Sequence, residues 1–141
     1  MKENSTLDLS RGLMSEPNLD AYLAQNQSDF SDEDMTGFLN RLYQRIAVSK
    51  ATLARQAGMS EVYLHQVFSG RRRPSRDRLL CLCIGLEATL EETQCLLKQS
   101  AYAQLYPKSK RDAIITYGIL HHMELHAIND KLFAENEKTL F

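Results

Sequence analysis

Residues 49–75 read SKATLARQAGMSEVYLHQVFSGRRRPS and contain the signals of two short helices joined by a tight turn. Gly58 stands where the first helix must end, and glycine tolerates the positive φ of a helix C-terminus. Ser60 follows two residues later and is a favourable N-cap for a second helix. The sequence therefore predicts one helix near residues 50–57 and another near residues 61–69.

The apolar residues of this stretch give each predicted helix one side to bury. Leu53 and Ala57 are four residues apart on the first helix, and Leu64 and Val67 are three apart on the second. Gly70 ends the second helix, and Pro74 prevents its continuation. Two short helices that meet at a glycine, the second with an exposed face, form a helix-turn-helix.

This pattern resembles the helix-turn-helix of the lambda repressor/Cro-like regulators, also called the xenobiotic-response-element type. The matching positions are Leu53-Ala54, Gly58-Met59-Ser60, Leu64, Val67, Gly70, Pro74-Ser75, Leu79, Leu82-Cys83 and Leu86. The resemblance extends over residues 35–100, about half of the chain. It implies an all-α, five-helix, lambda-repressor-like DNA-binding domain.

The remaining sequence adds a segment on each side of this domain. We expect an acidic N-terminal arm with a short helix in residues 1–30, the helix-turn-helix domain in 31–100, and a two-helix C-terminal extension in 101–141. Ser31 and Asp34 resemble a capping box that would start the first helix of the domain at residue 31 and carry it to about residue 46.

Further capping signals mark the later helices. Ser75 precedes an apolar helix to about residue 86, and Thr89 with Glu92 forms a second capping box. Pro107 interrupts the connector before a helix beginning at Ser109. A last helix over residues 124–136 would align Leu125, Ile128 and Leu132. The last two helices are expected to pack on the core or on a second copy of it.

The net charge of −1 conceals a strong asymmetry along the chain. Residues 1–38 carry two basic and eight acidic side chains, whereas residues 39–78 carry nine basic and two acidic ones. The basic block coincides with the predicted helix-turn-helix, as expected of a surface that neutralises DNA phosphates. Acids such as Asp29 and Asp32 to Asp34 favour a solvated helix start that suits the helix dipole. The alternative is that the arm folds back over the basic block and weakens DNA binding.

The resemblance also implies which residues meet DNA, because that family places its second motif helix in the major groove. The implied base-facing residues are Ser60, Glu61, Val62, Tyr63 and Gln66. Gln66 can bridge an adenine edge, Glu61 can accept from cytosine, and Val62 can touch a thymine methyl group. Lys50, Arg71, Arg72 and Arg73 would neutralise phosphates, and Arg76 and Arg78 would pair with Asp77 or Glu87.

The leading functional prediction is a transcriptional regulator that binds double-stranded DNA as a homodimer. The alternative is a helix-turn-helix-fold adaptor for a protein partner, favoured by Glu61, Val62 and Phe68 on or near the reading helix. Phe68 replaces a residue that is usually polar and is expected to pack under a cover, for which the N-terminal arm is a candidate.

Other chemistry has weaker signals. His122 and His126 are four apart, but a metal site there lacks a supporting motif, and Cys81 and Cys83 point to different sides of a helix. We expect no enzyme, no cofactor and no metal. Three cysteines and the absence of a long apolar run in the sequence predict a cytoplasmic protein without a membrane segment.

Overall fold

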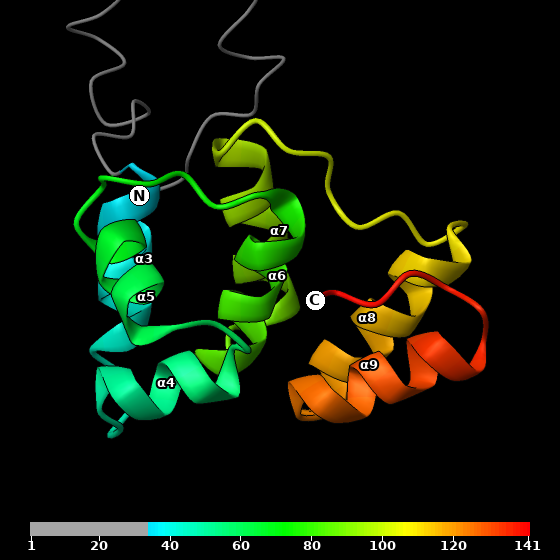
Figure 1. Ribbon diagram of the computed structural model, residues 1–141. Coiled ribbons are helices and arrows are strands. Elements are labelled where there is room, and N and C mark those ends of the chain that lie inside the picture. The colour runs from blue at the N-terminus through cyan, green and yellow to red at the C-terminus, as the bar shows by residue number, and fades with distance from the viewer. Residues whose placement is uncertain (1–33) are drawn as a thin grey trace, which may run out of the picture. The chain divides into compact units, whose positions relative to one another are not determined.

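A computed structural model describes residues 34–141, and this part of the chain is entirely helical, as the sequence predicts (Figure 1). The helices of the described part are α3 (Met35–Tyr43), α4 (Lys50–Gln56), α5 (Glu61–Phe68), α6 (Arg76–Gly85), α7 (Leu90–Gln99), α8 (Lys110–Leu120) and α9 (Leu125–Ala134).

The predicted helix-turn-helix is formed by α4 and α5, which pack against each other. The N-caps Ser49 and Ser60 accept hydrogen bonds from the backbone N–H groups of Thr52 and Tyr63, which satisfies donors that a helix start leaves unpaired. Gly58 has a φ of 67° in the turn, the left-handed conformation for which glycine is suited. The local signals around Gly58 thus predicted both helices and the turn correctly.

The start of α3 differs from the prediction. Asp34 is the N-cap itself, and its side chain accepts a hydrogen bond from the N–H of Gly37 at 2.9 Å. The predicted capping box, with Asp34 inside a helix that begins at residue 31, is therefore wrong. Ser31 and the acidic arm of residues 1–30, with its predicted short helix, lie outside the described residues.

Helix α6 is buried on more than one side. Leu79, Leu82 and Leu86 are fully buried, as predicted, and so are Leu80 and Cys81 between them. The cause is that α6 packs against α4 and α7 and also against α9. An apolar surface all round a helix is the expected sequence for such a central position.

Two ion pairs attach the C-terminal extension to α6. The guanidinium of Arg76 donates to the carbonyl of Ala103 at 2.8 Å and binds the carboxylate of Asp112 at 3.1 Å. Asp77 binds Arg111 at 3.1 Å. The predicted pairing of Arg76 with Asp77 or Glu87 is therefore wrong, because side chains from the distant extension are the nearer partners.

The two C-terminal helices pack onto the same chain, the first of the two arrangements expected. Helix α8 contacts α7, and α9 contacts α6. Their own close approach depends on Gly118, where a Cβ would lie 2.4 Å from Cδ1 of Ile128. Ile115 and Leu132 are also fully buried. The C-terminal segment then returns toward α6, and Asn129 holds the N–H of Leu140 at 2.7 Å (Figure 1).

Candidate nucleic-acid interface

The exposed side of α5 combines polar and apolar side chains. Glu61, Val62 and His65 are exposed, with Val62 at 69% of its full accessibility. Tyr63 and Gln66, the other predicted base-facing residues on this helix, are half-buried. The exposed side of this short helix offers hydrogen-bonding groups and the apolar side chain of Val62. The DNA major groove is wide enough to admit a helix.

His65 belongs to this face, and the sequence prediction missed it. Its Nε2 lies 3.4 Å from Oε1 of Glu61, one helical turn earlier. The i, i+4 spacing of the two residues was the signal that could have found the contact. A protonated His65 would neutralise the acid of the predicted reading helix.

Two arginines flank Tyr63, which lies in the first turn of α5. The guanidinium carbon of Arg72 lies 5.7 Å from the centroid of the Tyr63 ring, and that of Arg78 lies 5.3 Å from it. Arg78 also donates to the carbonyl of Gly58 at 3.4 Å, which fixes it beside the turn. Arg55 and Ser60 line the same cleft with Tyr63 and Arg78. We name Arg55, Arg72 and Arg78 the guanidinium cluster.

The sequence prediction placed neither Arg55 nor Arg78 in the interface. Arg55 is exposed in the last turn of α4. Arg78 is in the first turn of α6, where Ser75 caps its N–H. Their common neighbour Tyr63 lies on α5, so the cluster depends on the packing of three helices and has no local signal in the sequence.

The three consecutive arginines of the loop make different contacts. The backbone N–H groups of Arg71 and Arg72 both donate to the carbonyl of Gln66, at 2.9 and 3.2 Å, which ties the loop to the end of α5. The side chain of Arg71 is exposed. Arg73 instead donates to the carbonyl of Ser100, and its guanidinium carbon lies 4.7 Å from the centroid of the Tyr102 ring.

Lys50 lies against aromatic rings at the start of α4. Its ammonium nitrogen is 4.9 Å from the centroid of Phe68 and 5.4 Å from that of Tyr43, distances at which a cation is attracted by a ring face. The two rings meet edge to face, 5.8 Å apart. The prediction that Phe68 is a packing residue is confirmed, and its described cover is Tyr43 of α3.

In the described residues, the histidines and cysteines do not gather into a metal site. Residues 34–141 contain no group of three metal-ligating side chains, and His126 pairs with Glu124 at 3.2 Å. Burial raises the pKa of the Cys81 and Cys83 thiols from 9.0 to about 12, which keeps both protonated. Among the helices described, none is long and apolar enough to cross a membrane.

Comparison with known proteins agrees with this geometry. Residues 34–96 match the family model described as a helix-turn-helix domain. The match begins at the N-cap of α3, includes α4, the turn and α5, and ends within α7. No curated protein and no solved structure matches the chain significantly. The described residues thus form an all-α fold with a helix-turn-helix domain, and α8 and α9 follow the matched region.

Proposed function

We propose that this protein is a sequence-specific transcriptional regulator of the lambda repressor/Cro-like type, which inserts α5 into the major groove of double-stranded DNA. The observation that carries the proposal is the guanidinium cluster around Tyr63, beside the exposed side of α5 formed by Glu61, Val62 and His65. DNA recognition has two requirements, and the two features together meet them. The positive charge can contact phosphates and so position the helix, and the exposed side chains of the helix can read the bases.

Base reading is assigned to the exposed side of α5. Ser60, Glu61, Val62, Tyr63 and Gln66 keep the roles implied by the sequence, and His65 joins them. The contact between the His65 ring nitrogen and Glu61 supports this assignment, since it engages the carboxylate that would otherwise face the phosphates alone.

Phosphate binding is assigned to Arg71 and to the guanidinium cluster. Arg55 and Arg71 are exposed, and Arg72 and Arg78 lie beside Tyr63. Lys50 has a smaller part because its ammonium lies against Phe68 and Tyr43. Arg73 supports the fold, because its guanidinium binds the connector at Ser100 and Tyr102.

A homodimer would present two copies of α5 to an inverted repeat, with half-sites about 34 Å apart. Three large apolar side chains of α8 and α9 support this arrangement, because they stay exposed: Tyr117, Leu120 and Phe133. The proposed activity is binding rather than catalysis, and the cytoplasm is its proposed location.

An adaptor without sequence-specific DNA binding is the second candidate. Its specific support is Val62, an apolar side chain that is 69% exposed at the middle of the reading face. In an adaptor, Val62 and the neighbouring Glu61 would contact a protein partner instead of bases.

Selection from a pool of randomised DNA duplexes separates the two candidates. The regulator proposal expects the full chain to enrich an inverted repeat whose half-sites lie about one helical turn apart. A variant with Glu61, Val62 and Gln66 changed to alanine keeps the guanidinium cluster and should retain DNA without enriching a motif. Retention of duplexes by the wild-type protein without any enriched sequence would contradict the regulator proposal and favour the adaptor.

A further inference from the structure

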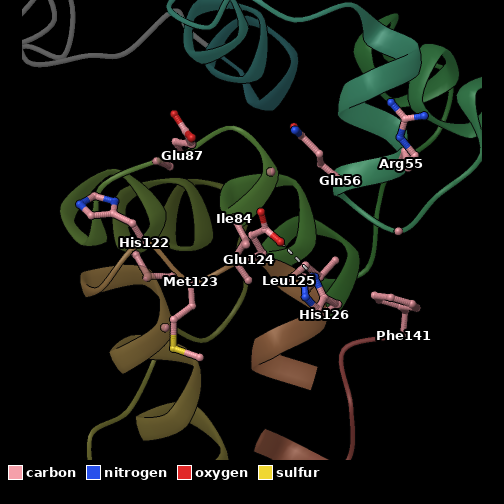
Figure 2. A pocket seen from close by; sticks show the side chains of 15 residues that line it. Arg55, Gln56, Ile84, Glu87, His122, Met123, Glu124, Leu125, His126 and Phe141 are labelled. Carbon is pink, nitrogen blue, oxygen red and sulfur yellow. Dashed lines mark ion pairs between the residues drawn. The ribbon is translucent and has the colours of Figure 1, made fainter. Parts of the chain in front are cut away.

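A cavity of about 330 Å³ lies between the helix-turn-helix and the C-terminal helices, away from the exposed side of α5. Its walls come from the ends of α4, α6 and α8, the start of α9 and the C-terminal Phe141 (Figure 2). This volume is in the range of small-molecule sites in proteins. None of the DNA-binding roles proposed above requires a cavity here. Arg55, which has one of those roles, lies on the edge of the cavity.

Three helices end at this cavity. Gly58, Glu87 and His122 follow α4, α6 and α8, have positive φ values of 67°, 56° and 53°, and all line the cavity. A helix C-terminus carries a partial negative charge and stabilises a nearby cation. Helix α9 begins there, with Leu125 and His126 in the lining, and Ala88 of the lining directly precedes the N-cap of α7, so three helix ends of negative polarity face two starts of positive polarity among the described helices.

The ionisable lining also favours a cation. Glu87 and Glu124 supply two carboxylates, against one arginine, Arg55. Glu124 is 3.2 Å from His126, and Figure 2 shows this pair between His122 and Phe141. The carboxylates of the lining thus outnumber its one guanidinium. An anionic ligand would be repelled by both carboxylates and by the three helix ends.

Apolar side chains complete the lining. Ile84, Met123 and Leu125 belong to it, and Phe141 closes it at the turn of the helix-turn-helix. The Phe141 ring lies so close to Gly58 that a Cβ there would be 2.7 Å from Cε1 of the ring. An aromatic ring that lines the same cavity as two carboxylates can attract a cation through its face and can also pack against an apolar group.

We propose that this cavity binds a small organic cation, a protonated amine with an apolar body. Its ammonium group binds at Glu124 and Glu87, near the three helix C-termini, and its body packs against Leu125, Ile84 and Phe141. This part of the inference is independent of DNA binding.

Arg55 links the cavity to the interface, because it lines both this cavity and the cleft beside Tyr63. Arg55 is exposed, and a bound ammonium repels its guanidinium toward the cleft, where the proposed function assigns it to a phosphate. The cation therefore tightens DNA binding. This second part rests on the proposed function.

Binding is measured by titrating the full chain with phenethylamine near pH 7 and following protein amide resonances or heat. The matched probes are 2-phenylethanol, which is neutral, and phenylacetate, which is an anion. We expect saturable binding of the amine, with shifts at Ile84, Leu125 and Phe141, and weaker binding of the other two. The Glu87→Gln, Glu124→Gln variant should weaken amine binding by up to about tenfold, because two ion pairs with exposed carboxylates are lost.

The control is Glu91→Gln, which removes an exposed carboxylate from α7 outside the cavity and should leave binding unchanged. Thermal melting of both variants checks their folding. Amine binding that is absent, that is matched by phenylacetate or that is insensitive to the double glutamine variant overturns the cavity proposal.

Adding phenethylamine to a DNA titration tests the coupling. Tighter DNA binding in the wild type, lost with Arg55→Gln, is expected. Amine binding without any change in DNA affinity overturns the coupling alone. Failure of the protein to bind DNA overturns the proposed function and leaves the result of the amine titration standing.

Discussion

Replacing Arg71 and Arg72 with alanine should lower DNA affinity and, more diagnostically, flatten its dependence on salt. Arg71 is exposed, and Arg72 lies on the outside of Tyr63. Their backbone contacts to Gln66 do not use the side chains, so alanine should keep the loop in place. The double variant therefore removes charge from the interface with little change in fold.

The magnitude follows from the proposed phosphate contacts. With Arg55, Arg71, Arg72 and Arg78 each meeting one phosphate, the slope of log K against log salt is about −3.6 per subunit. Losing two contacts makes the slope about −1.8. At 0.1 M salt the double variant should bind about 60-fold more weakly per subunit, if the electrostatic contribution vanishes near 1 M.

Fluorescence anisotropy with a labelled duplex at several salt concentrations measures both slopes. The matched control is Lys98→Ala with Lys108→Ala, which removes the same charge from exposed positions on α7 and the connector. The control slope should equal that of the wild type. Equal flattening in both double variants, or none in either, would refute the placement of DNA at α5.

Three further predictions concern stability, thiol chemistry and the arm. Asp112→Ala should cost about 3 kcal/mol in urea unfolding, because its guanidinium partner stays partly buried without a counter-charge. Ellman's reagent at pH 8 should modify the exposed Cys95 quickly but reach Cys81 and Cys83 only on unfolding. Folding raises the pKa of both buried thiols from 9.0 to about 12, so the unfolded state loses these protons first as the pH rises. The free energy of unfolding should therefore fall between pH 9 and pH 12 by about 1.4 kcal/mol per pH unit for each thiol. If the acidic arm covers the basic face, deleting residues 1–26 should tighten DNA binding at fixed salt, and unchanged or weaker affinity would exclude that hypothesis.

Much of the fold was predictable because its signals are local. The turn at Gly58, the cap at Ser60 and the capping box of Thr89 with Glu92 each depend on residues within a few positions of one another. Their geometry is set by backbone conformation and by unpaired N–H groups at helix starts, both of which can be read from a short stretch of sequence.

The candidate site was predicted less completely because its charges are arranged by tertiary contacts. Arg73 resembles its two neighbours in sequence, but its guanidinium is held by Ser100, 27 residues later. The ammonium of Lys50 lies against rings from two other helices. Arg78 is brought to Tyr63 only by the packing of α6 near α5. Residue type alone could not separate the arginines whose guanidinium is held by contacts within the chain from those whose guanidinium is available to DNA.

The role of α5 as the reading helix is tested most directly by repeating the randomised-duplex selection with Gln66→Ala. We expect the enriched inverted repeat to persist but to lose its preference for adenine at one position in each half-site, a preference worth about 1–3 kcal/mol. Gln44→Ala, at an exposed residue after α3, should leave the motif unchanged. An identical enriched motif from the wild type and Gln66→Ala, each binding with the same affinity, would contradict the assignment of Gln66 to base reading on α5.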